Sequence, residues 1–340
     1  MSSLMLAEAL AAPDALARFL AADADSWGAL AARLRAADPP AAVTVARGSS
    51  DHAASYLAYL LTARLGLPVA SLSPSLVTLR HAPLRARGLL AAALSQSGQS
   101  PDIVESLAAL GAAGAITVAL VNDTASPLAR TAAHCLALHA GPERAVAATK
   151  SYIASLAAAA RLVGAWQDDA PFLAGLASLP AHLARAAQAD WSAAIPPLAA
   201  ATRAIVVGRG LGLAIAAEAA LKLKETSGLH AEAFSGAELR HGPMALIGPG
   251  ETVLVLAMRG PALPGLVALA AELRERGAAT LLAAPADIRP RDLTLTTTGE
   301  PDLDPLAAIQ SFYPLAATLA EARGMNPDNP PNLSKVTRTL

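Results

Sequence analysis

Cysteine and aromatic residues are scarce in this chain of 340 residues. There is one cysteine, Cys135, and aromatic residues make up 3% of the sequence. A single cysteine excludes an internal disulfide and a cysteine-based zinc site, and it fits a cytoplasmic protein, which is the location we expect. Because 54% of the residues are nevertheless hydrophobic, alanine and leucine must supply most of the core.

Long hydrophobic runs and an excess of either charge are also missing. The longest uncharged stretch, residues 106–122, contains two glycines and is shorter than the roughly 20 residues that cross a bilayer. The N-terminal segment mixes alanines with Glu8, Asp14 and Arg18, which favours an amphipathic helix over a signal peptide. Lys and Arg number 26 against 27 Asp and Glu, without a basic stripe or tail. We therefore expect neither membrane nor nucleic acid as a partner.

An internal repeat organises the chain. The segment VARGSS at residues 45–50 returns as VGRGLG at residues 207–212, so that Gly48 and Gly210 are 162 residues apart. Gly98 and Gly260, each after a later apolar run, are again 162 apart. Each glycine-containing turn follows a strand-like run and precedes a helical pattern. Such series predict parallel strands with helices on both faces.

We therefore predict an α/β fold of two tandem, doubly wound parallel-sheet domains of the flavodoxin-like kind, related by duplication. An N-terminal helical segment of residues 1–30 is expected to pack on the first domain. The domains cover residues 30–165 and 185–322. A C-terminal tail, residues 324–340, contains three prolines and cannot form a continuous helix.

The second turn of the first half is rich in hydroxyls. Its sequence is SQSGQS at residues 95–100, whereas its counterpart at residues 257–262 is AMRGPA. Hydroxyl and backbone N–H donors between a strand and a helix suit a phosphate group. An ordinary helix cap would explain one serine but not the whole set. The candidate phosphate-binding residues are Ser95, Gln96, Ser97 and Ser100, with Ser49 and Ser50 on the neighbouring turn.

The second half has charged residues at helical spacing instead. Glu218, Lys222 and Glu225 fall at i, i+4 and i+7 and share one helical face. A solvated face with one ion pair would give the same spacing. Glu238 and His241 could contribute to a metal site, but the Gly-Pro that follows makes a turn and no third ligand is evident. We expect no metal and no cofactor.

At these residues the sequence resembles the sugar isomerase (SIS) domain family. It is most similar to the isomerase half of glucosamine-6-phosphate synthase and to the stand-alone isomerising deaminases. The matching motifs are Gly48-Ser49-Ser50, Ser95-Gln96-Ser97-Gly98, Val121-Asn122, Glu143 with Ala148-Thr149-Lys150, Lys222-Leu223-Lys224-Glu225, His230-Ala231-Glu232-Ala233, Gly236-Ala237-Glu238-Leu239-Arg240-His241-Gly242-Pro243 and Asn332-Leu333-Ser334-Lys335.

The resemblance implies a role for each catalytic candidate. Glu225 corresponds to the residue that moves a proton between carbons 1 and 2 of the sugar, and Lys222 to a lysine near those carbons. His241 corresponds to the histidine that opens the sugar ring from a neighbouring subunit, so we expect a homodimer. Lys335 corresponds to a tail lysine that forms an imine with the ketose.

The resemblance also implies a phosphorylated sugar as substrate, and two departures bear on the reaction. The chain begins without the glutamine-hydrolysing domain of the synthase, which favours the reverse direction. Ala148, a substrate-binding position, stands where the synthase has a hydroxyl, which leaves the sugar open. We expect deamination of glucosamine 6-phosphate to fructose 6-phosphate and ammonia. The alternatives are another phosphorylated amino sugar, a glycated amino acid, a non-catalytic sugar-phosphate sensor, or synthesis with a separate glutaminase chain.

Overall fold

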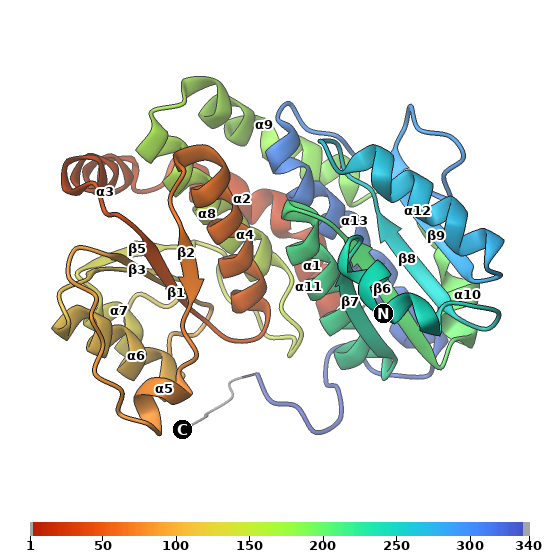
Figure 1. Ribbon diagram of the computed structural model, residues 1–340, viewed down its shortest axis with the longest axis horizontal. Helices are drawn as coiled ribbons and strands as arrows, with labels where there is room; N and C mark the ends of the chain where they lie inside the picture. The colour runs from red at the N-terminus through yellow and green to blue at the C-terminus, as the bar shows by residue number, and fades with distance from the viewer. Residues whose placement is uncertain (1–2, 336–340) are drawn as a thin grey trace. The chain divides into compact units, whose positions relative to one another are not determined.

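The computed structural model, which describes residues 3–335, contains two five-stranded sheets, each built of parallel strands (Figure 1). Contacts divide the chain into two units. The first-sheet unit comprises Asp14–Glu143, Lys150–Ala177 and the chain from Ser334 onwards. The second-sheet unit comprises the chain up to Pro13, Arg144–Thr149 and Ser178–Leu333. The predicted fold class is confirmed.

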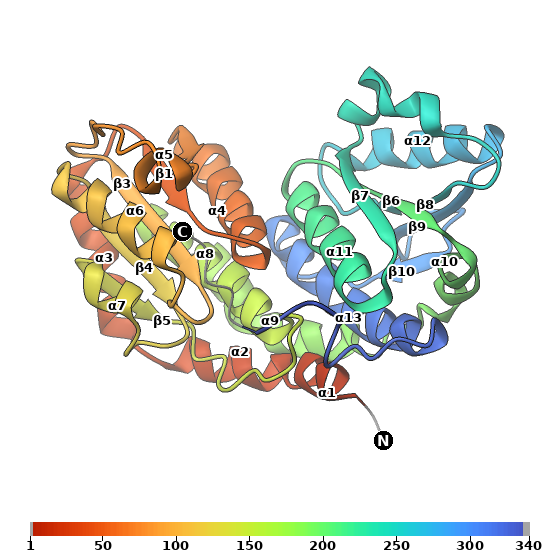
Figure 2. The same cartoon turned by 90° about the horizontal axis from the view of Figure 1, so that it is seen from below.

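The first sheet has the strand order β2-β1-β3-β4-β5, with every neighbouring pair parallel. The helices on its two faces are linked by contacts within each layer, α3 and α4 with α8 on one side and α5 and α7 with α6 on the other (Figure 2). The elements of this unit are α3 (Ala24–Ala37), β1 (Ala42–Val45), α4 (Ser49–Leu65), β2 (Val69–Ser71), α5 (Ser75–Thr78), β3 (Leu90–Ser95), α6 (Pro101–Ala112), β4 (Ile116–Val121), α7 (Pro127–Thr131), β5 (His134–Ala137) and α8 (Lys150–Gln167). The division between the units falls within α2 (Ala12–Ala21) and α9 (Ala170–Ala186), after Pro13 and Ala177.

The second sheet repeats this topology in the order β10-β9-β8-β6-β7. Its elements are α1 (Leu4–Leu10), a short 3₁₀ helix η1 (Ser192–Ala194), α10 (Ile195–Ala200), β6 (Arg203–Gly208), α11 (Leu211–Ser227), β7 (His230–Ser235), η2 (Glu238–His241), η3 (Pro243–Leu246), β8 (Thr252–Leu256), α12 (Leu263–Glu275), β9 (Ala279–Pro285), β10 (Leu293–Leu295), η4 (Pro301–Leu303) and α13 (Asp304–Ala322).

The offset of 162 residues holds at the ends of corresponding helices. Gly48 and Gly210 occupy the N-cap positions of α4 and α11 with φ of 53° and 62° and the same ψ of −134°. Side chains rarely adopt such a backbone, so glycine is required for this turn in both halves. Both helices are 17 residues long, and they end at Gly66 and Gly228. The two halves therefore repeat the turn geometry as well as the sequence.

Small side chains allow dense layers in the first-sheet unit. Strand β3 reads LAAALS and is buried from Leu90 to Leu94. Helix α8 is buried over nearly its whole circumference, which is the pattern of a helix enclosed by other elements. Alanine on both surfaces lets helix and sheet approach closely, and this explains how a core with few aromatics is filled.

The segment before β1 is divided between the two units. Helix α1 belongs to the second-sheet unit, where the backbone N–H groups of Leu4 and Met5 donate to the Asp328 carboxylate at 2.8 and 2.7 Å. Negative charge at a helix N-terminus is favourable because it meets unpaired N–H groups and the positive end of the helix dipole. Helix α3 belongs to the first-sheet unit.

Candidate functional site

The serine-rich loop connects β3 to α6 at the carboxyl edge of the first sheet. The Ser95 hydroxyl accepts a hydrogen bond from the Gly98 N–H at 2.9 Å, and the Ser97 hydroxyl accepts one from the Gln99 N–H at 3.3 Å. Ser100 is the N-cap residue of α6. The candidate side chains are partly accessible to solvent. The loop is thus held in shape by its own hydroxyls while remaining open to a ligand.

Gly98 is required where this loop passes α7. Its φ is +62°, and a Cβ atom placed on it would lie 2.1 Å from Ser126 Oγ and 2.6 Å from Ser126 Cβ. Real Cβ atoms do not approach other atoms so closely, so a larger residue would displace the loop or the start of α7. The glycine thereby fixes the path of the serines on either side of it.

The turn after β1 lies beside the serine-rich loop because β1 and β3 are neighbours in the sheet. Ser49 and Ser50 begin α4 at this edge and are half-buried. All six predicted phosphate-binding residues therefore come from two adjacent turns at one edge of the first sheet. In open α/β sheets, ligands bind at this carboxyl edge.

An ion pair that sequence reasoning missed joins these two turns. Arg47 Nε and Nη2 each lie 3.0 Å from Asp102 Oδ2, and the Asp102 side chain is 1% exposed. Asp51, in the first turn of α4, is a second carboxyl near Arg47; burial raises its pKa, and the charges of His52 and Arg47 offset part of that rise. The available signal was Arg47 directly before Gly48, but its partner could be identified only once the strand order was known.

The tail lysine also belongs to the first-sheet unit. Lys335 Nζ donates to Glu143 Oε2 at 2.9 Å, and the Glu143 side chain is fully buried. Glu143 also accepts from the Ser151 N–H at 3.0 Å and the Ser151 hydroxyl at 2.6 Å. Burial alone would raise the pKa of Glu143, but the Lys335 ammonium and the Ser151 hydrogen bonds outweigh burial and lower it.

Ala148, the other predicted substrate-binding position, lies in the sequence between Glu143 and the start of α8. It is half-buried in the segment Arg144–Thr149, which contacts mainly the second-sheet unit. As an alanine it offers a sugar only its backbone groups.

The charged face of α11 is buried in the second-sheet unit. Lys222 lies between two acids: its Nζ is 3.5 Å from Glu218 Oε1, and it donates a short hydrogen bond to Glu225. The Lys222 and Glu218 side chains are 1% and 0% exposed, whereas Glu225 is 21% exposed. The buried Tyr313 hydroxyl donates to Glu218 at 3.4 Å. A solvated face was therefore the wrong interpretation of this spacing.

Glu218 and Glu225 differ in exposure, and therefore in the chemistry that each can perform. Glu218 is enclosed by Lys222 and Tyr313 and can act only on its neighbours. Glu225 has a solvent-facing side and a cation behind it, so it can exchange a proton with a ligand. Of the two carboxylates, Glu225 is the one that solvent or a ligand can reach.

His241 ends the 3₁₀ helix η2, which follows the edge strand β7, and its side chain is exposed. Beside it, Arg240 Nη2 pairs with Glu272 Oε2 of α12 at 2.7 Å. That ion pair holds the turn against the second-sheet unit and leaves the histidine facing outwards. Its reach into a neighbouring subunit stays a prediction.

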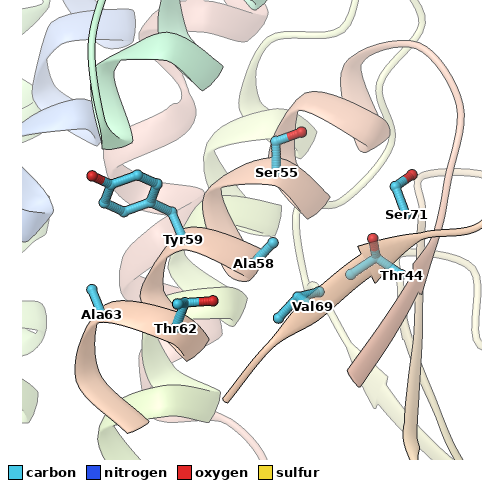
Figure 3. Close-up of a pocket in the computed structure, with 8 residues that line it drawn as sticks. All are labelled: Thr44, Ser55, Ala58, Tyr59, Thr62, Ala63, Val69 and Ser71. Carbon is cyan, nitrogen blue, oxygen red and sulfur yellow. The ribbon is translucent and has the colours of Figure 1, made fainter. Parts of the chain in front are cut away.

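A cavity of about 540 Å³ lies in the first-sheet unit between α4 and the strands β1 and β2. In Figure 3, Ala58 and Thr62 of α4 lie on the side that faces Thr44 and Val69 of the strands. None of the predicted phosphate-binding residues lines this cavity. It is therefore separate from the serine-rich loop.

Across residues 3–335, no helix is long and apolar enough to span a membrane. Within the same range, no group of three or more His, Cys, Asp and Glu residues is arranged to hold a metal ion.

The repeated sheet topology and the ligand-edge loops define a duplicated, doubly wound α/β protein. A model of the SIS domain family matches residues 37–164 and 197–284, more than half of the chain. The chain therefore belongs to the SIS domain family, and the predicted resemblance is confirmed.

Relatives of known sequence and structure agree with this assignment. The chain is 38% identical over 262 residues to a glutamine–fructose-6-phosphate aminotransferase (isomerizing) of Aeropyrum pernix, covering 72% of this chain and 42% of that protein. It is 35% identical over 302 residues to the enzyme of the same name from Methanothermobacter thermautotrophicus, covering 86% and 50%. The chain thus spans about half the length of these relatives or less.

A solved structure covers nearly the whole chain. A candidate phosphosugar isomerase from Silicibacter pomeroyi DSS-3 superposes with a TM-score of 0.89 at 42% identity, over 96% of this chain and all of that one. A glucosamine-6-phosphate deaminase from Thermotoga maritima has a TM-score of 0.80 at 22% identity, over 99% of this chain and all of that one, which shows a shared fold.

Proposed function

We propose that this chain is a sugar-phosphate isomerase whose substrate is an amino sugar, and that it converts glucosamine 6-phosphate to fructose 6-phosphate and ammonia. The observation that carries the proposal is the position of Glu225, a partly exposed carboxylate in contact with a buried lysine. Isomerisation of an aldose to a ketose needs one base that takes a proton from carbon 2 and returns it to carbon 1. Glu225 supplies that base.

The reaction proceeds from the open-chain form of the sugar. His241 opens the ring by moving a proton between the hydroxyl and the ring oxygen, which suits an imidazole because its two nitrogens can accept and donate a proton. Glu225 removes the proton at carbon 2 and delivers it to carbon 1, while the carbon-1 oxygen gains a proton and the nitrogen loses one, which converts the amino aldose to a ketose imine. Water then adds to the imine carbon, and ammonia leaves.

Lys222 contributes charge at the reacting carbons. Its ammonium is held by the buried Glu218 on one side and contacts Glu225 on the other. A fixed cation stabilises negative charge that develops on the sugar during proton transfer. Because Glu218 is fully buried, it orients Lys222 without contacting the sugar.

The serine-rich loop holds the phosphate, and Lys335 stabilises the bound sugar by charge. Lys335 is held in an ion pair with Glu143, and an amine forms an imine only when it is free to attack with its lone pair. In the deaminating direction Lys335 therefore needs only to position the sugar.

The assay for this function mixes the purified protein with millimolar glucosamine 6-phosphate and follows ammonia and fructose 6-phosphate in equal amounts. Absence of both products would rule the deaminase out. Galactosamine 6-phosphate and a 6-phosphorylated glycated amino acid, tested in parallel, separate this substrate from its closest alternatives. If each of these ligands binds and none reacts, the protein is a sugar-phosphate sensor.

A second candidate function is synthesis in the opposite direction. The aminotransferase relatives, at 35% and 38% identity, favour it. Fructose 6-phosphate is incubated with ammonium, and separately with glutamine, and glucosamine 6-phosphate is measured. Product from ammonium alone is expected of a reversible deaminase, whereas dependence on glutamine and a second chain identifies a synthase.

A further inference from the structure

The six candidate phosphate-binding residues at the edge of the first sheet carry no charge. Five are serines and one is glutamine, so they supply hydrogen bonds but nothing that balances a phosphate dianion. Arginine is the side chain best suited to that task, because its planar guanidinium presents several N–H donors to the phosphate oxygens at once. Arg47 is the cation that precedes Ser49 and Ser50 on the same turn.

Asp102 holds the Arg47 guanidinium in place. Its Nε and Nη2 both contact one oxygen of Asp102, while the other oxygen of that carboxylate accepts the Ile103 N–H at 2.9 Å. Asp102 is 1% exposed and Arg47 is 51% exposed. The guanidinium has five N–H donors, and this pairing occupies two of them. The outer side of Arg47 therefore retains donors on the edge that carries the serines.

The corresponding positions of the second half show which other features occur together with the Arg47–Asp102 ion pair. At the offset of 162 residues, Arg47 corresponds to Arg209 and Asp102 to Pro264. The second half has thus kept the arginine but lost both its carboxylate and the serines of the following loop. The Arg47–Asp102 pair occurs in the half that retains the hydroxyls, which ties it to the ligand rather than to the shared fold.

A contribution to the stability of the two turns does not by itself explain the Arg47–Asp102 ion pair. Water screens the half-exposed Arg47 guanidinium, so the ion pair gains only modestly from its charge. Burial of Asp102 is already supported by the Ile103 N–H. The arrangement instead suits an arginine that must be held at a defined place with part of its surface open.

We propose that Arg47 binds the phosphate group of the substrate and that Asp102 is its positioning residue, so that the pair selects phosphorylated over unphosphorylated sugars. This inference rests on the proposed function in that the ligand is a sugar phosphate. It adds the charge that the serine-rich loop lacks.

Titration calorimetry of the full chain tests the proposal without requiring turnover. Glucosamine 6-phosphate, fructose 6-phosphate, inorganic phosphate and unphosphorylated glucosamine are titrated into the wild type, Arg47→Gln, Arg47→Lys and Arg209→Gln. Arg47→Gln should weaken both sugar phosphates roughly 10- to 100-fold, the usual range for a lost charged hydrogen bond. Arg47→Lys should be intermediate, and Arg209→Gln, the matched control, should equal the wild type. Affinity for glucosamine should not change.

Two further measurements separate charge recognition from a structural effect. The slope of log affinity against log salt should be smaller in Arg47→Gln, because a phosphate contact made by a cation is screened by salt. Asp102→Asn should lie between the wild type and Arg47→Gln in sugar-phosphate affinity, and its thermal unfolding is recorded beside it to confirm that it folds.

Three outcomes decide against the proposal. Unchanged sugar-phosphate affinity in Arg47→Gln overturns it, as does an equal loss for glucosamine, which would make Arg47 a brace. Failure of the wild type to bind any phosphate-containing probe also overturns it. Binding that depends on phosphate and on Arg47, without release of ammonia, supports this inference while rejecting the deaminase. The two proposals therefore fail separately.

Discussion

Lys335 and Glu143, 192 residues apart in the sequence, meet at 2.9 Å in the first-sheet unit. The acid is fully buried and the lysine is 23% exposed. Removing a carboxylate from water is costly unless its oxygens are bonded, and here Ser151 and Lys335 share that task. The contact ties the C-terminal tail to the segment just before α8.

Replacing the acid should release the tail. In Glu143→Gln the ammonium of Lys335 loses its partner and can move into water. The loss of one charged hydrogen bond, about 1.5–3 kcal/mol, should accelerate hydrogen exchange of the tail amides about 10- to 100-fold. Mass spectrometry of peptides covering residues 324–335 measures this. If Lys335 acts on the sugar, kcat/KM should fall by at least about tenfold.

The matched control for this variant is Ser151→Ala. It removes one hydrogen bond to Glu143 but leaves the charge pair with Lys335 in place, so tail exchange should rise only a few-fold. Equal exchange in the wild type and Glu143→Gln would show that the ion pair does not hold the tail.

The same ion pair should weaken in acid. The pKa of Glu143 lies below its ordinary value of 4.5, and a carboxyl group with a lower pKa in the folded state stabilises that state above its unfolded pKa. This stability is lost as the pH falls through the folded pKa. The difference in unfolding free energy between the wild type and Glu143→Gln should therefore be constant from neutral pH to about 5 and shrink below that. Urea unfolding at a series of pH values measures it; a difference that grows in acid contradicts the assignment.

Much of the fold was predictable because each repeated turn can be recognised from a short stretch of sequence. The turns after β1, β3, β6 and β8 each contain a glycine, and the offset between Gly48 and Gly210 is enough to locate the second domain. The parallel direction of the strands followed from the series of strand, turn and helix. What spacing could not predict was which face of α11 is buried, since Glu218 and Lys222 look the same on a solvated helix.

Contacts between segments that lie far apart in the chain also could not be predicted from the sequence. Arg47 pairs with Asp102 because β1 and β3 are adjacent, and that adjacency depends on the whole sheet. Lys335 and Glu143 meet across 192 residues, and no local pattern connects them. Long-range ion pairs are decided by topology and burial, so they become visible only in three dimensions.

The buried lysine of α11 should be more important for stability than its neighbour on the same helix. In Lys222→Met, Glu218 stays enclosed without a cation, and an uncompensated buried charge costs about 3–5 kcal/mol. Lys224→Met is the matched control; that side chain is exposed, so the free energy of unfolding should change by less than about 0.5 kcal/mol. Chemical denaturation measures both. Similar values for the two variants would contradict the burial of Lys222.

The two acids beside Lys222 should differ in catalysis. Glu225→Gln should abolish exchange of the carbon-2 proton with solvent deuterium while sugar-phosphate binding stays intact, because it removes the base but no phosphate contact. Glu218→Gln should retain measurable exchange, because Glu218 only orients Lys222. Exchange is followed by NMR of the sugar. Persistence of exchange in Glu225→Gln would overturn its assignment as the base.

We propose that His241 acts across a dimer, and co-expression of two inactive variants tests this. If each site uses Glu225 of one chain and His241 of the other, a heterodimer of Glu225→Gln with His241→Asn has one intact site and one doubly altered site. Random pairing then restores about a quarter of wild-type activity, while each variant alone remains inactive. Light scattering confirms the dimer. No recovery in a mixture proven to contain heterodimers places both residues of a site in one chain.

The close passage of Gly98 by Ser126 predicts a specific cost for a single methyl group. In Gly98→Ala the new Cβ would meet Ser126 Oγ at 2.1 Å, so the serine-rich loop must shift or the start of α7 must move. Gly66→Ala is the matched control: its φ of +67° is similar, but nothing lies within 4 Å of the added atom. In both variants alanine must adopt a left-handed backbone, which costs about 1 kcal/mol. Overpacking should destabilise Gly98→Ala by roughly a further 1–3 kcal/mol.

Ser126→Gly in the same chain removes the two nearest atoms and should recover much of that extra cost, as well as the sugar-phosphate affinity. Thermal unfolding and titration calorimetry on the single and double variants measure the coupling, and independent effects of the two substitutions would mean that the loop does not depend on this contact.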